Sequence, residues 1–461
     1  MQEISTELIK EAVYNLCLKA NICLNYDIYS KIFNAYENED NVEIKSRLKN
    51  ILKNAKIAFE EKMPLCQDTG QVLVFLETGQ DVIFTGDFII EAINSAVLKC
   101  YGENFFRKSV VKNAVFERTN TKTNTPCIIY TKYTKEDNVK IKVLIKGAGS
   151  ENKSKLKMLL PTANEDEIIQ NCADMILEAG INACPPMFIG IGFGGTAEKA
   201  LLLSKEALIC NDFTKKEIEL AKKIKLKVNE KAPDEYKNCF VLDVNLKTEQ
   251  THIACLPVGL TINCHSDRYS IAVIKDGQIT YKHSIPEFRE IAAEKKVIKE
   301  INTSDTAGLK SLKEGENVLL TGEIYVARDM AHKKMIELLN EGKTLPVDIN
   351  NKIIFYAGPC PKPTGKISGS IGPTTAGRMD KYAIKLYKQG VFATIGKGTR
   401  SEEVKDFIKK SGKKYFVVQG GIAALLAQKV TSCEISAFED FGAEAIYKIK
   451  VDKLPVKTEI A

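Results

Sequence analysis

Residues 391–418, VFATIGKGTRSEEVKDFIKKSGKKYFVV, contain two short apolar runs separated by a charged segment with helical spacing. The runs at Phe392–Ile395 and Tyr415–Val418 have the length and composition of buried strands. The segment Glu402–Lys410 between them predicts a helix. A strand, a helix and a second strand in this order are typical of a sheet flanked by helices, and they predict an α/β fold.

The same alternation extends over residues 316–461 and predicts one compact C-terminal α/β domain. The further strands that we expect are Val318–Leu320 with Ile324–Val326, Ile353–Tyr356 and Cys433–Ala437, and the further helices are Met330–Asn340, Met379–Lys388 and Ile422–Ala427.

Residues 1–284 predict a larger N-terminal α/β domain. Apolar residues recur at three- and four-residue spacing over the first 62 residues, which favours helices. Asn164 followed by acidic residues predicts the start of a helix that ends near Gly180. A further helix is expected at Phe88–Cys100, and strands at residues 72–77, 139–145 and 240–244. Residues 285–315 are charged with few large apolar side chains, so we expect an interdomain linker with some helix.

Composition narrows the class of protein. The 461 residues are 44% hydrophobic and 27% charged, which is ordinary for a globular protein. The net charge of +7 is spread along the chain, and no basic arm indicates a nucleic-acid partner. The chain has no apolar run of about 18 residues that would span a membrane. The N-terminus, MQEISTELIKEA, lacks the features of a signal peptide, so a cytoplasmic location is expected.

Three of the thirteen cysteines lie in loops rich in Pro and Gly. An odd number of cysteines with irregular spacing argues against a disulfide framework. Cys66 lies in PLCQDTG, Cys184 in NACPPMFIGIGFGG and Cys264 in TINCHSDR. Their wide separation does not match zinc sites, whose ligands come in close pairs. Three such thiolates could hold three corners of a [4Fe-4S] cluster, although buried cysteines that simply fill the core are the alternative.

Seven motifs together resemble one enzyme family. They are PLCQDTG, KGAGSENK, NACPPMFIGIGFGGTAEKA, THIACLPVGLTINCHSDR, TGEIYVARDMAHKK, GPTTAGRMDKY and IGKGTR. They resemble the class I fumarate hydratases and the related tartrate dehydratases, in the same order along the chain. The resemblance implies a cluster-binding N-terminal domain, a smaller C-terminal β/α domain of the swivelling type, an active site in the cleft between them, and a homodimer.

The resemblance also implies a chemical role for several residues. Cys66, Cys184 and Cys264 would bind three irons of a [4Fe-4S] cluster, and the fourth iron would act as a Lewis acid. Thr374 would exchange the proton on the substrate carbon with help from Asp68. The alternative for Thr374 and its neighbour Thr375 is that they only cap the following helix.

Further motif positions would bind a dicarboxylate. The residues implied as substrate-binding or catalytic are Gln67, Arg107, Gly149, His252, Arg328, Arg378 and Lys397. Arginine suits this role because its planar guanidinium matches a carboxylate with two hydrogen bonds. Ala148 departs from the glycine usual in the family, which questions how closely the backbone approaches the ligand there. Gly192 and the glycines after it would let backbone N–H groups reach a carboxylate or a sulfide.

The function implied is that of a hydro-lyase that reversibly hydrates fumarate to L-malate. Tartrate and mesaconate remain alternative substrates for the same mechanism. A non-catalytic iron–sulfur sensor or binding protein is the alternative from a different class, and a zinc protein is a third. Neither a nucleic-acid nor a membrane partner is expected.

Overall fold

The computed structural model describes residues 2–180, 183–291 and 298–461. The chain divides into two compact units. The N-terminal unit comprises residues 1–59 and 68–289, and the C-terminal unit comprises residues 60–67 and 290–461. The segment that contains Cys66 therefore belongs to the C-terminal unit, although it lies early in the sequence. Both units mix helices and strands, which confirms the predicted α/β fold.

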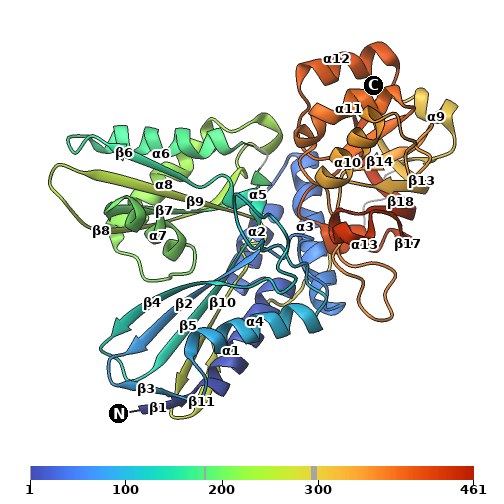
Figure 1. Ribbon diagram of the computed structural model, residues 1–461. Coiled ribbons are helices and arrows are strands. Elements are labelled where there is room, and N and C mark those ends of the chain that lie inside the picture. Colours follow the sequence, from blue (N-terminus) through green and yellow to red (C-terminus); the bar gives the residue numbers. More distant parts are fainter. Residues whose placement is uncertain (1, 181–182, 292–297) are drawn as a thin grey trace. The chain divides into compact units, whose positions relative to one another are not determined.

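The N-terminal unit contains two larger sheets and most of the helices (Figure 1). Its helices are α1 (Thr6–Ile22), α2 (Tyr26–Glu37), α3 (Val42–Glu60), α4 (Ile89–Glu103), α5 (Ala148–Glu151), α6 (Glu165–Ala179), α7 (Ala197–Ala207) and α8 (Lys215–Glu230). Its strands are β1 (Gln2–Ser5), β2 (Gln71–Gly79), β3 (Val82–Thr85), β4 (Ile128–Thr134), β5 (Val139–Lys146), β6 (Lys155–Leu159), β7 (Met187–Gly195), β8 (Val241–Thr251), β9 (Leu256–Cys264), β10 (Tyr269–Lys275) and β11 (Gln278–Tyr281).

A five-stranded sheet in the order β11-β10-β5-β2-β4 packs against α1 and α4. Alternation explains the packing, because Val139, Ile141 and Val143 of β5 lie on one face and all are buried. They join Ile9 and Val13 of α1 in one hydrophobic core. This core holds the loops that follow β5 and precede β2 in fixed positions.

A four-stranded sheet in the order β6-β9-β7-β8 has different helices on its two faces. Ile189 and Ile191 of β7 share a core with α6 and α8. The alternating residues Gly190 and Gly192 face α7, where a Cβ on Gly192 would lie 2.3 Å from the carbonyl oxygen of Ala200. Our expectation that Gly192 opens the backbone to a ligand is therefore wrong, since α7 fills that space.

Helix α6 begins and ends where the sequence predicts. Asn164 accepts a hydrogen bond from the N–H of Glu167, and the side chain of Glu167 accepts one from the N–H of Asn164. This capping box satisfies two N–H groups that the first turn would leave unpaired. Gly180 follows the last helical residue with a positive φ of 58°, a conformation that favours glycine.

The C-terminal unit contains a seven-stranded sheet in the order β12-β13-β14-β15-β16-β18-β17. Because β13 also pairs with β18, strands β13, β14, β15, β16 and β18 form a closed ring. The strands are β12 (Lys299–Asn302), β13 (Asn317–Val326), β14 (Ile353–Phe355), β15 (Ala393–Gly396), β16 (Lys414–Val417), β17 (Val430–Ala437) and β18 (Ile446–Ile460). The helices are α9 (Thr306–Lys310), α10 (Asp329–Asn340), α11 (Asp380–Lys388), α12 (Glu402–Ser411) and α13 (Ala423–Ala427), as labelled in Figure 1.

Three elements differ from the expectations. The stretch from 285 to 315, expected to be a linker with some helix, contains strand β12 and helix α9. Its residues 292–297 lie outside the described part of the chain. The sequence gave no expectation of β18, which is the partner of three strands, or of β1, which pairs with β3 before the first helix. Among the described residues, none of the helices combines the length and the apolar character needed to cross a bilayer.

Candidate active site

Asp68 is the centre of a charged cluster in the N-terminal unit. Its carboxylate lies 3.1 Å from the guanidinium of Arg107 and accepts hydrogen bonds from the N–H groups of Ala148 (2.8 Å) and Gly70 (3.2 Å). Burial alone would raise the pKa of Asp68, but Arg107, Arg268 and the two N–H groups together lower it below its usual value. The carboxylate is therefore ionised at neutral pH.

The loop after β5 supplies the predicted Gly149 and closes around Asp68. Gly147 lies next to the Asp68 carboxylate, and Ala148 donates its N–H to it. The replacement of a glycine by Ala148 therefore leaves the backbone close to the site. At Gly149, in contrast, a Cβ would meet no atom within 4 Å. Gly149 thus borders open space, where a ligand can approach its backbone.

Arg268 is a member of this cluster that the sequence analysis missed. Its guanidinium donates to the carbonyl oxygen of Asp68 at 2.7 Å, and Arg268 is buried. A signal was present, because Arg268 ends the motif NCHSDR that begins next to the predicted ligand Cys264.

Cys184 and Cys264 lie at the same end of the four-stranded sheet. Cys264 ends β9 and pairs with Met187, the first residue of β7, and Cys184 comes three residues before Met187. Cys184 has a positive φ of 61°, which is uncommon for a residue with a side chain and is often found at functional sites. Both thiols are partly exposed, unlike the buried core cysteines. The structure therefore brings two of the predicted cluster ligands to one edge.

His252 lies at the opposite end of that sheet. It follows Thr251, which pairs with Gly195 at the far end of β7, whereas Cys264 pairs with Met187. Eight residues of extended strand separate these ends, a distance of about 26 Å. The imidazole of His252 is exposed, and its Nδ1 accepts the N–H of Ala254 at 3.2 Å. His252 is thus remote from Cys264 within the N-terminal unit.

The C-terminal unit holds Cys66 and Gln67 through backbone contacts. Ser370, which is fully buried, donates its hydroxyl to the carbonyl oxygen of Pro64 at 2.7 Å. The thiol of Cys360 donates to the carbonyl oxygen of Gln67 at 3.3 Å. Cys66 is partly exposed, and its sulfur lies 3.5 Å from Oε1 of Gln67. The first predicted ligand is therefore fixed by the segment 360–370.

Thr374 lies between the ends of two neighbouring strands of the C-terminal unit. Its N–H donates to Tyr356 after β14 at 2.7 Å, and its carbonyl oxygen accepts from Lys397 after β15 at 3.1 Å. The hydroxyl of Thr374 accepts a hydrogen bond of 3.0 Å from the guanidinium of Arg378. Neither Thr374 nor Thr375 caps the short 3-10 helix Ala376–Met379 with its side chain. The capping alternative therefore finds no support.

Two predicted arginines share a carboxylate in the same unit. Arg378 donates from Nε to Asp329 at 3.0 Å, and Arg328 lies 3.7 Å from the other oxygen of Asp329. Arg328 also forms an ion pair with Glu444, which accepts the N–H of Met330 at 2.8 Å. The unit therefore brings together Thr374, Lys397, Arg378 and Arg328, all four from different motifs.

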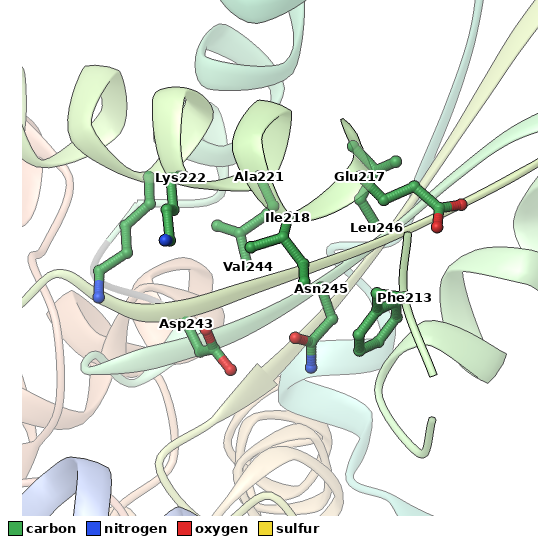
Figure 2. Close-up of a pocket in the computed structure, with 10 residues that line it drawn as sticks. Phe213, Glu217, Ile218, Ala221, Lys222, Asp243, Val244, Asn245 and Leu246 are labelled. Carbon is green, nitrogen blue, oxygen red and sulfur yellow. The ribbon is translucent and has the colours of Figure 1, made fainter. Parts of the chain in front are cut away.

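A pocket of about 210 Å³ elsewhere in the N-terminal unit contains none of the predicted residues. It lies between α8 and β8, as Figure 2 shows with Lys222 on the helix and Asp243 and Asn245 on the strand. Its charges already have partners in the protein, since Asp243 pairs with Lys31 at 2.5 Å and Lys225 donates to the carbonyl oxygen of Leu242 at 2.5 Å. We assign this pocket no role in the site.

The donor set fits a cluster with three protein ligands. Within residues 2–180, 183–291 and 298–461, no group of three His, Cys, Asp or Glu is arranged to hold a metal ion. Each unit by itself supplies at most two of the three predicted thiols, because Cys66 belongs to the C-terminal unit. All three are free and partly exposed, as thiols that bind a cluster must be.

Comparison with known proteins decides the family. The family model described as fumarate hydratase (Fumerase) matches residues 10–273, and the model described as fumarase C-terminus matches residues 278–460. The chain belongs to the class I fumarate hydratase family. The enzyme class predicted from the sequence, a fumarate hydratase-type lyase, is confirmed.

Relatives in this family come from distant organisms. The anaerobic class I fumarate hydratase of Escherichia coli is 32% identical over 442 residues, which cover 88% of this chain and 79% of the relative. The mitochondrial fumarate hydratase 1 of Leishmania major is 30% identical over 458 residues, 92% of this chain and 82% of the relative. A putative L(+)-tartrate dehydratase subunit alpha of Methanocaldococcus jannaschii is 38% identical over 278 residues, 58% of this chain and 98% of the relative.

Proposed function

We propose that this chain reversibly hydrates fumarate to L-malate with a [4Fe-4S] cluster held by Cys66, Cys184 and Cys264. The observation that carries the proposal is the match of both parts of the chain to this family, together with relatives of known name over most of its length. When bound, a cluster with one open iron supplies Lewis acidity toward the carboxylate and hydroxyl of the substrate.

The chain's own residues would bind the substrate dianion. Arg378 and Arg328 present guanidinium groups on one side of Asp329, and Arg107 presents a third beside Asp68. Arginine is suited to this task because its charge persists at all relevant pH values and its donors match a carboxylate. Gln67 and the open backbone at Gly149 would add neutral hydrogen bonds to the bound dicarboxylate.

Thr374 would carry the proton that moves at carbon. In the malate direction, water adds its hydroxyl to one alkene carbon and a proton reaches the other carbon from the Thr374 hydroxyl. In the reverse direction the C–H bond breaks, its electron pair forms the double bond, and the proton returns to the Thr374 oxygen. Arg378, 3.0 Å from that oxygen, stabilises the negative charge on it. Asp68 and Lys397 would complete the proton path.

His252 would act in a homodimer. Within the N-terminal unit it lies at the opposite end of the sheet from Cys264, so we propose that it serves the site of a second copy. Mixing His252→Ala with Cys264→Ser protein, each inactive alone, should restore activity, because the mixed dimer has one site with all its residues. Activity absent from the mixture, with mixed dimers demonstrated by tagged pull-down, would contradict this assignment.

A reducing, cytoplasmic location is part of the proposal. All thirteen cysteines are free, which suits a compartment that keeps thiols reduced.

L-Tartrate is a second candidate substrate, which the similarity to the putative tartrate dehydratase subunit favours. The test is anaerobic turnover after reconstitution with iron and sulfide, with fumarate, mesaconate, L-tartrate and D-tartrate compared. Loss of fumarate absorbance with formation of malate is expected. Turnover of tartrate or mesaconate alone would keep the mechanism and change the substrate. No turnover by protein with a full cluster would indicate the non-catalytic alternative.

A further inference from the structure

Lys146 is a buried cation whose position the proposed mechanism does not use. It is the last residue of β5, and only 1% of its side chain is exposed. A buried ammonium group is unfavourable unless hydrogen bonds and negative charges replace its water. The partners of Lys146 therefore indicate why the chain places a lysine there.

Two of these partners belong to the loop that carries Cys264. The ammonium group donates to the carbonyl oxygen of Ile262 and to Oδ1 of Asn263, both at 2.6 Å. The side-chain amide of Asn263 donates in turn to buried Asp267 at 2.5 Å. Asn263 is thus held on one side by Lys146 and on the other by Asp267. These contacts fix the base of the loop 263–267, which includes Cys264.

The backbone of the same residue supports the Asp68 cluster. A Cβ on Gly70 would lie 2.5 Å from the carbonyl oxygen of Lys146, so only glycine fits there, and Gly70 has a positive φ of 67°. The two residues after Lys146 are Gly147 and Ala148, which contact the Asp68 carboxylate. One residue therefore joins the Asp68 loop to the Cys264 loop.

The negative charge available to Lys146 within the chain is shared. Glu151 lies 3.7 Å from Lys146, but it is closer to Lys205, at 2.6 Å. Burial lowers the pKa of Lys146 to about 8, while Glu151, Asp267 and Cys264 act in the opposite direction. An ionised Cys264 would supply the additional negative charge that this buried ammonium group needs.

We propose that Lys146 is a positioning residue for Cys264, which it holds through Ile262 and Asn263, and that its charge stabilises the Cys264 thiolate. This inference rests on the proposed role of Cys264 as a cluster ligand. Cations beside a cysteine increase the thiolate fraction and with it the reactivity of the sulfur. The effect can therefore be measured on the full-length chain without a cluster and without substrate.

The test is the rate at which iodoacetamide alkylates Cys264 in the cluster-free protein, followed by peptide mass spectrometry. Lys146→Met should slow this reaction about threefold or more at pH 7.5, and Lys146→Arg should retain most of the wild-type rate. Lys205→Met is the matched control, because it removes a neighbouring cation that does not contact the Cys264 loop. Cys210, which is partly exposed and distant in sequence, gives an internal reference in every variant.

A second measurement uses the reconstituted protein. Loss of the cation should make the cluster harder to reduce and lower the iron retained per chain in Lys146→Met. If that variant does not fold, as judged by circular dichroism, Lys146→Gln replaces it and should give the same two changes. Wild-type alkylation rates and wild-type iron retention in a folded neutral variant would overturn the inference. A slower alkylation in protein that hydrates none of the substrates would uphold the role of Lys146 and reject only the proposed function.

Discussion

The two units hold their site residues in different ways. In the N-terminal unit, Asp68 and Arg107 are 17% and 11% exposed and are already paired, with Arg268 and two backbone N–H groups around them. In the C-terminal unit, the Arg378 and Asp329 side chains are 50% and 32% exposed. The comparison teaches that the first set is built into the core of its unit, whereas the second set is presented on loops and a helix end.

This difference predicts different consequences of mutation. Buried, paired charges stabilise the fold only as a complete set, because removal of one partner leaves the other without compensation. Exposed charges contribute little to stability. Substitutions in the N-terminal set should therefore affect stability as well as activity, and those in the C-terminal set should affect activity alone.

The largest expected effect is the loss of the cluster. Cys264→Ser should abolish activity and reduce bound iron, because it releases one corner of the cluster while the fold is kept. Iron analysis, visible absorbance and turnover after anaerobic reconstitution measure this. Cys433→Ser, a partly exposed cysteine of β17, is the control and should retain both iron and activity. Full activity in Cys264→Ser would contradict the ligand assignment.

The next effect separates catalysis from stability in the C-terminal unit. Thr374→Val should lower kcat by about 10²- to 10⁴-fold, the range typical for loss of a proton-transfer group. Iron content and melting temperature should stay at wild-type values. Thr375→Ala is the matched control, because that side chain makes no capping bond. An equal loss in both variants would show that the segment, rather than the Thr374 hydroxyl, matters.

A buried charge gives the corresponding effect in the N-terminal unit. Asp68→Asn should lower the free energy of unfolding by about 2–4 kcal/mol, because Arg107 and Arg268 lose their counter-charge. The folded-state pKa of Asp68 lies below its unfolded value, so its stabilisation is present above about pH 4 and is lost as the pH falls further. Denaturant titrations from pH 7 to pH 3 should therefore show less acid sensitivity in Asp68→Asn than in wild type. Equal slopes would remove the electrostatic explanation.

The smallest effect tests the exposed set. Arg378→Lys should raise KM by about tenfold, because lysine keeps the charge but loses the planar guanidinium that matches a carboxylate. Thermal unfolding should not change, since the Arg378 ion pair with Asp329 is half exposed. A clear fall in melting temperature would mean that the two units do not differ as proposed.

Local signals in the sequence predicted much of the fold. Helix α6 was correct at both ends, because its capping box and Gly180 act within a few residues. Strand β18 could not be predicted from its own residues. Its stability depends on pairing with β13, β16 and β17, and this information is distributed over the whole C-terminal unit. Strand β12 was missed for a related reason, because only Ile301 of its four residues is buried.

The candidate site shows the same limit. The motifs contain Asp68, Arg107 and Arg378, but their spacing gives no distance between them. Lys146 and Arg268 lie inside the same motifs and were missed, because a lysine or an arginine in sequence is usually exposed and only the fold shows these two to be buried. The remote position of His252 likewise follows from the register of β7 with its neighbours, which no local pattern contains.

The most direct test of the central claim is the dependence of fumarate hydration on bound iron. Protein purified and reconstituted without oxygen would be divided into samples with graded iron and sulfide content, and the loss of fumarate absorbance would be followed in each. The account predicts a rate that rises in proportion to cluster content and that disappears after exposure to air. Full activity in protein without iron would contradict it.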